Sequence, residues 1–349
     1  MQLQHLLYAV TAGLSLLFLI SDVAAQNVPY ISYSSSELQE HLPLYRWPYA
    51  SKVAPRIGGS VESSNDKLRL DIGGTVLLFS NSRVISFYKY GGDDVSFHGD
   101  NGANDSSKRI VKLWSLSTDY VVLGADFFTW SRLRSEADFK FPVEAVDYYL
   151  GLYGSVRLNE IGDRYTYSHG SNEIEQRRTS YIASLRVAHI SAHLVDGDPE
   201  FLTENDAPAV HSREFIDLSF AVDHLFWKGA WIAGVHRPRN GFLRPYLGAQ
   251  WLFSTIPDTL GRITPYVGID ASIQVLDGKG PALRVGYEFR LNTEYKTIGE
   301  HSFRAGVKLS DVYDNGVVIE GGYSSGRSPY GQYFDRKEEY FSLGFSLEH

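Results

Sequence analysis

Two histidines and a serine stand at alternate positions near the end of the stretch from residue 180 to 195, namely His189, Ser191 and His193. Side chains two residues apart share one face of a β-strand. Earlier in the stretch that face is apolar, so polar groups replace apolar ones at one end of the predicted strand. If the chain folds back around residue 203, Glu214 of the next stretch lies across from His189.

A serine hydroxyl beside an imidazole whose ring is oriented by a carboxylate is the arrangement that makes serine a nucleophile. One hypothesis is therefore a catalytic group with Ser191 as nucleophile, His189 as base and Glu214 as orienting acid. The other hypothesis, which the sequence favours, is a hydrogen-bonded cluster of these residues with His193 that holds the adjoining loop in place.

The same strand end offers a third interpretation, a metal site. His189 and His193 would bind the ion together with Asp196 or Asp198. Such a site needs a further defined ligand, which the sequence lacks. We therefore predict no metal and no cofactor.

The spacing of His189 and Ser191 resembles that of outer-membrane phospholipase A and the lipid A deacylases. In those enzymes a His and a Ser also stand two apart on an outward strand face, with an Asn or Glu partner on a neighbouring strand. The resemblance covers this one hairpin. It implies a lipid acyl hydrolase that works near the outer leaflet of an outer membrane.

Strict alternation of apolar and polar residues recurs along the second half of the chain. It is clearest at 263 to 275, 283 to 291, 303 to 309 and 341 to 347. Several segments offer about nine or more alternating residues, the length that a tilted strand needs to cross a bilayer, whereas strands of soluble sandwiches average about five or six. After Gln26 no apolar run approaches the roughly 18 residues expected of a membrane-spanning helix.

These segments predict one all-β domain, an antiparallel transmembrane β-barrel of about 12 strands, within a range of roughly 10 to 14. Further strands are expected upstream, near 212 to 225, 179 to 194, 144 to 158, 119 to 131, 109 to 116, 83 to 90 and 67 to 80. The barrel is predicted to occupy residues 52 to 349. Residues 1 to 25 have the pattern of an export signal peptide, and residues 26 to 51, which do not alternate, are predicted to be a periplasmic lead-in.

Connection lengths predict which end of the barrel faces outward, because outer loops are longer than periplasmic turns. Longer connections near 324 to 336, 292 to 299, 255 to 261 and 226 to 229 alternate with tighter ones near 311 to 315, 276 to 281 and 237 to 241. By this count residues 195 to 211 lie on the periplasmic side. That position opposes the hydrolase hypothesis.

If the apolar faces meet lipid, a mixed set of charged side chains lines the lumen. It comprises Arg186, Asp217, Asp223, Arg244, Asp270, Arg284, Glu288, Arg290, Arg304, Lys308 and Glu320. Paired charges of both signs are typical of a filled lumen, whereas a selective channel favours one sign. We therefore predict a mostly filled lumen, with an open porin as the alternative.

Composition excludes several other classes of function. The formal net charge of −8 and the pI near 5.8 argue against nucleic acid as a partner. Cysteine is absent, which excludes disulfides, thiolate metal sites, a cysteine nucleophile and a lipoprotein anchor.

Four segments, 146 to 151, 189 to 194, 212 to 214 and 326 to 333, together resemble a family of uncharacterised bacterial outer-membrane β-barrel proteins, known as a domain of unknown function. In that family the His-Leu pair runs on into Gly-Asp-Glu, whereas this chain continues from Val195 to Asp198 as Val-Asp-Gly-Asp. The resemblance implies a barrel in the outer membrane of a Gram-negative bacterium, in contact with lipid. The terminal strand resembles those that the barrel assembly machinery recognises. No activity follows, so the predicted role is structural, surface-exposed or narrow transport.

Overall fold

The computed structural model describes residues 47–63, 67–82, 87–90, 113–117, 120–134, 141–166, 173–194, 211–232, 235–258, 261–275, 280–312 and 315–348. The predicted signal peptide and residues 26–46 of the predicted lead-in lie outside this part of the chain. Within it, the strands are β1 (Ile57–Glu62), β2 (Lys67–Ser82), β3 (Phe87–Tyr90), β4 (Leu113–Ser117), β5 (Tyr120–Arg134), β6 (Val143–Thr166), β7 (Glu173–Leu194), β8 (His211–Ile232), β9 (Val235–Ile256), β10 (Ile263–Gln274), β11 (Ala282–Asn292), β12 (Ile298–Lys308), β13 (Gly316–Arg327) and β14 (Lys337–Glu348). A short 3-10 turn, η3 (Gly331–Tyr333), lies between β13 and β14.

Twelve of these strands close into an antiparallel barrel. They follow the order β6, β5, β2, β1, β14, β13, β12, β11, β10, β9, β8 and β7, and β7 pairs again with β6. The wall is continuous because β1 pairs on one side with β2 and on the other with β14, where Gly59 faces Phe345. This closure confirms the predicted all-β barrel of about 12 strands.

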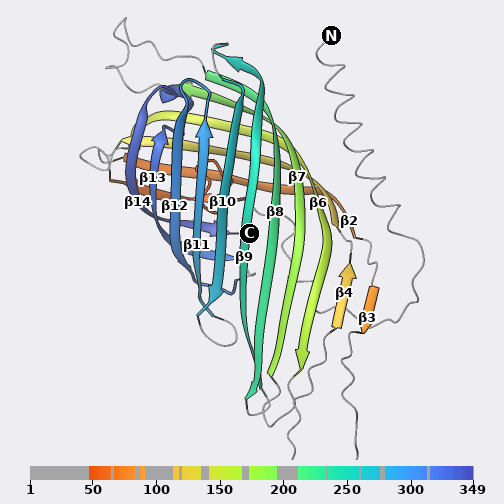
Figure 1. The fold of residues 1–349 in the computed structure, drawn as a ribbon. Helices are drawn as coiled ribbons and strands as arrows, with labels where there is room; N and C mark the ends of the chain where they lie inside the picture. Colours follow the sequence, from red (N-terminus) through yellow and green to blue (C-terminus); the bar gives the residue numbers. More distant parts are fainter. Residues whose placement is uncertain are drawn as a thin grey trace, which may run out of the picture.

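The short strands β3 and β4 lengthen the wall without adding to its circumference. β4 pairs with β6 beyond the stretch where β5 pairs with it, and β3 pairs with β4 (Figure 1). The described parts of the strands predicted at 83 to 90 and 109 to 116 therefore extend the wall alongside β6. The remaining place in the barrel is taken by β1, a six-residue strand that the sequence did not indicate.

The connections predicted near 226 to 229 and 237 to 241 are wrong. β8 and β9 are each 22 residues long and stay paired to Ile232 and Val235, so the residues of both predicted connections lie within paired strands. Gly229 faces Pro238 within this ladder. Glycine and proline usually mark turns, and here they lie in paired strands, which is why the local pattern misled the count.

The corrected count changes the end of the barrel that is assigned to the connection between β7 and β8. β7 ends and β8 begins at the same end of the barrel as the connections 257–262, 293–297 and 328–336. We call this the loop end, and the opposite end, where β1 begins and β14 stops, the terminal end. The connection after β7 therefore groups with the connections that were predicted to face outward.

Burial alternates along the barrel strands in the sense opposite to that of a soluble core. On β10 the apolar residues Ile263, Val267 and Ile269 are exposed, whereas Asp270 and Gln274 are buried. The same inversion recurs on β11, where exposed Leu283 and Val285 flank buried Arg284. The barrel thus has an apolar exterior and a largely polar interior. Among the described residues, no helix has the length and apolar character needed to cross a membrane.

Residues 47–56, which we call the lumen segment, lie inside the wall. The Tyr49 N–H donates to Asp270 Oδ2 at 3.0 Å, and Arg56 approaches the Asp71 carboxylate at 3.4 Å. The Lys52 ammonium donates to the carbonyl oxygen of Arg327 at 3.3 Å. The last five residues of the predicted lead-in, 47–51, therefore occupy the barrel interior.

An aromatic cluster anchors the start of the lumen segment. The rings of Phe128 and Tyr149 stack with centroids 4.3 Å apart, and Trp47 meets both edge-on. The Arg186 guanidinium covers the Trp47 ring, with its Cζ 3.7 Å from the ring centroid. Cation–π and edge-to-face contacts of this kind favour one fixed position of the indole.

Candidate functional site

The side chains of the predicted catalytic group lie on the outer wall. In the ladder between β7 and β8, His189 faces Glu214 directly, and His189 Nδ1 lies 3.2 Å from Glu214 Oε1. An ionised carboxylate only accepts hydrogen bonds, so the pair forms with Nδ1 donating. The Nε2 atom is then the ring position that can accept a proton from another group.

Ser191 occupies the next outward position along β7. It faces Ser212 on β8 and Tyr148 on β6, and its side chain is partly exposed. The side chain of His193 and both Asp196 and Asp198 lie outside the described residues, so the metal hypothesis stays a prediction. The structure thus brings His189 and Glu214 into contact and places Ser191 one outward position away.

A second polar pair lies on the outward face of the same two strands. Thr179 faces His224 in the ladder, and Thr179 Oγ1 lies 2.9 Å from His224 Nδ1. This pair stands ten residues from the His189 and Glu214 pair along each strand. Between the two pairs the outward residues on β8 are Ile216, Leu218, Phe220 and Val222.

All eleven charged residues that the sequence assigned to the lumen point into the barrel, where each has a polar partner. Arg244 makes a bidentate pair with Asp223, Arg304 lies 3.1 Å from Glu320, and Arg290 lies 3.3 Å from Glu288. Arg186 pairs with Asp126, and both Arg284 and Lys308 pair with Glu348. Asp217 accepts a hydrogen bond from Tyr266, and Asp270 accepts one from Tyr49 of the lumen segment. Buried charges that are paired in this way avoid the cost of an uncompensated charge.

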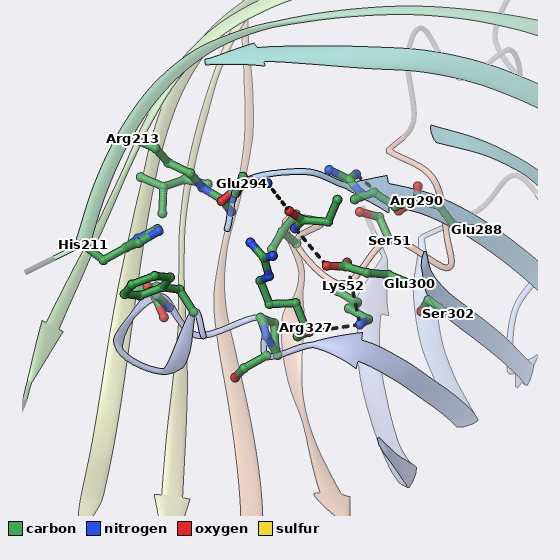
Figure 2. Close-up of a pocket in the computed structure, with 18 of the residues that line it drawn as sticks. Ser51, Lys52, His211, Arg213, Glu288, Arg290, Glu294, Glu300, Ser302 and Arg327 are labelled. Atoms are coloured by element: carbon green, nitrogen blue, oxygen red, sulfur yellow. Dashed lines mark hydrogen bonds and ion pairs between the residues drawn. The ribbon is translucent and has the colours of Figure 1, made fainter. Parts of the chain in front are cut away.

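Near the loop end the interior opens into a small cavity. Figure 2 shows its charged lining, in which Arg213, Glu294 and Arg327 lie on one side and Lys52 of the lumen segment on another. Arg213 is paired with Glu294 at 2.5 Å. The four sequence segments that carry the family resemblance all contribute to this lining, through Asp147, Ile190, Arg213 and the stretch from Arg327 to Gly331.

The connection between β13 and β14 shapes one wall of the cavity. Gly326 has φ of 118°, a value that L-residues with a side chain rarely adopt. A Cβ at this position would lie 2.7 Å from Glu300 Cγ. Further along, burial raises the pKa of the Tyr330 hydroxyl well above its usual value, so Tyr330 stays neutral under the loop.

Several residues of the interior were not singled out from the sequence. Asp126 binds Arg186, Thr75 and Trp47, and His211 and Arg327 line the cavity. Strand alternation places Asp126 on the inward face, so the sequence pattern could have predicted that this residue lines the lumen. The contributions of Arg327 and the lumen segment depend on chain paths that no local pattern specifies.

No protein-family model, curated protein or solved structure matches the chain.

Proposed function

We propose that this chain is an integral outer-membrane β-barrel protein whose interior is closed by its own lumen segment. The observation that carries the proposal is the apolar wall bounded by two polar pairs ten residues apart. Ten residues of antiparallel strand span about 34 Å. At a tilt of about 35 to 45° they rise about 24 to 28 Å, close to the roughly 25 Å apolar band of outer-membrane barrels.

A closed interior supports a structural or surface role over that of an open porin. Trp47 and Tyr49 lie across the lumen, and the charges around them are engaged in pairs of opposite sign. An ion crossing this space would have to displace these groups. Narrow transport would require the lumen segment to move.

Two measurements test the proposal together. The full chain, expressed in a Gram-negative host, should fractionate with outer-membrane lipid, and the purified protein should pass little current in a planar bilayer. Recovery in the soluble fraction would contradict the membrane assignment. A large, steady conductance of the unmodified protein would contradict the closed interior.

The wall pair also favours a second function, lipid acyl hydrolysis. His189 presents Nδ1 to the Glu214 carboxylate, which leaves Nε2 as its proton-accepting atom, as in serine hydrolases. The pair lies where the apolar wall ends, at the level of lipid ester groups in the proposed placement. With the connections between β8 and β9 corrected, the pair lies at the loop end. The loop count therefore no longer assigns the pair to the periplasmic side, which was the objection to a hydrolase.

In this reaction Ser191 Oγ attacks the ester carbonyl of a lipid while His189 takes the hydroxyl proton. The C–O bond of the ester then breaks, and the proton passes to the departing alcohol oxygen. Water, activated by the same imidazole, hydrolyses the acyl-serine and releases the fatty acid. Glu214 holds the ring and stabilises its protonated form.

Release of fatty acid from phospholipid or lipid A by the purified protein tests this second function. Ser191→Ala is expected to remove turnover, whereas Ser212→Ala, which changes the facing serine on β8, is the matched control. His224→Asn serves as the control for His189→Asn, because His224 is the outward histidine at the other edge of the wall. Equal turnover in Ser191→Ala and the unmodified protein, including none in either, would rule the hydrolase out.

A further inference from the structure

The cavity at the loop end is small. It leaves about 50 Å³ for the centres of water-sized molecules, and about 10 to 15 Å³ on this measure holds one water, so it has room for a few waters or one small ion. Its floor includes Ser51, Lys52 and Val53 of the lumen segment, and its rim includes Pro329 and Phe334 of the connection between β13 and β14. It is separate from the outer wall that carries His189.

One buried cation in this cavity, Arg327, forms no ion pair within 4.0 Å among the described residues, although Glu294, Glu300 and Asp335 lie near enough to act on it electrostatically. Arg213 is paired with Glu294, Arg290 with Glu288, and Lys52 lies 3.9 Å from Glu300. Arg327 is 4% exposed, yet it donates only to the Lys296 carbonyl, through Nη2 at 2.9 Å. Its Nη1 has no hydrogen-bond partner in the described part of the chain, and Figure 2 shows the side chain pointing into the cavity.

A second set of unsatisfied polar atoms lies on β6 and β8, which also line the cavity. Both ring nitrogens of His211 and the Oδ2 atom of Asp147 are buried without a partner among the described residues. The two side chains converge on Gly331, where a Cβ would lie 2.5 Å from His211 Nδ1 and 3.0 Å from Asp147 Oδ1. Buried donors and acceptors are costly when unpaired, so two such groups around one space point to a polar occupant.

We propose that this cavity binds a small oxyanion, a carboxylate or a phosphate, with Arg327 as its principal ligand. The guanidinium supplies a charge-assisted hydrogen bond to the anion through Nη1. His211 and Asp147 accommodate hydroxyl groups on the remainder of the ligand. Arg213, Arg290 and Lys52 are already paired with Glu294, Glu288 and Glu300, so Arg327 is the cation of the described lining that is left without an ion pair within 4.0 Å.

Calorimetric titration of the purified full chain in detergent tests the site. Inorganic phosphate and lactate are the probes, because phosphate offers only the oxyanion whereas lactate adds a hydroxyl group. At least one is expected to bind saturably, and Arg327→Gln should weaken that binding by about tenfold or more. Arg304→Gln is the matched control, since it removes a lumen arginine that lies outside the cavity.

Circular dichroism establishes that each variant is folded. If Arg327→Gln does not fold, Arg327→Lys decides the question, because it keeps the charge but not the planar fork of donors. Weaker binding by the folded lysine variant supports the site. Failure of the unmodified protein to bind either probe would overturn the proposal, as would unchanged binding by the folded Arg327 variant.

Discussion

Asp223 and Arg244 form a bidentate ion pair inside the barrel, in which Arg244 Nη2 donates to Asp223 Oδ2 at 2.7 Å. Arg157 approaches the same carboxylate at 3.6 Å. All three side chains are almost completely buried, so the carboxylate is the shared counter-charge of two arginines on β6 and β9. The pair on the outer wall, His189 and Glu214, is far more exposed, with side chains 42% and 35% accessible.

Removing the charge of Asp223 is therefore expected to destabilise the barrel strongly. Asp223→Asn leaves two buried guanidinium groups without their shared carboxylate, and breaking a buried pair in this way costs about 3 to 5 kcal/mol. Glu214→Gln, on the exposed pair, should cost no more than about 1 kcal/mol. Urea unfolding of both variants in lipid vesicles measures the difference. Similar losses in the two variants would show that the interior pair is hydrated.

The lumen segment is expected to control conductance. Deleting residues 47 to 54 removes Trp47, Tyr49 and Lys52 from the lumen while leaving β1 in place. Planar-bilayer recordings should then show a higher conductance than the unmodified protein, because the remaining wall encloses a polar, water-accessible space. Unchanged conductance of a folded deletion variant would mean that other parts of the chain close the barrel.

Charge on the outer wall should be tolerated according to depth. Leu218 lies near the middle of the apolar wall, so Leu218→Arg is expected to cost about 2 to 4 kcal/mol, whereas His224→Arg at its edge should cost about 0 to 1 kcal/mol. The free energies of unfolding in vesicles provide the comparison. Equal costs at the two positions would contradict the proposed membrane placement.

Gly326 should resist substitution by any residue with a side chain. Its φ of 118° is strained for L-residues, and a Cβ would meet the Glu300 side chain. Gly326→Ala should therefore lower the free energy of unfolding by at least about 1 to 2 kcal/mol. Gly74→Ala is the control, because a Cβ there meets nothing within 4 Å. Equal stability of the two variants would show that the backbone at residue 326 adapts.

Much of the wall was predictable because it follows a local rule. Period-two alternation is set by the geometry of each strand, so it specified the barrel, the apolar exterior and the inward direction of charges such as Arg284 and Asp270. The opposition of His189 and Glu214 also followed, because a single hairpin sets its register. The number of connections between residues 226 and 242 could not be predicted in this way, because glycine and proline, which usually mark turns, lie there in paired strands.

The sequence by itself determined that this chain forms a closed β-barrel and which face of each strand points outward or into the lumen, because both depend on neighbours two residues apart. Only the tertiary structure decided what fills the lumen. Trp47 reaches Asp126 across 79 positions, and Lys52 reaches Arg327 across 275. Such contacts, and the cavity that Arg327 and His211 both line, exist only once the wall has closed around the segment, so they depend on curvature and chain path.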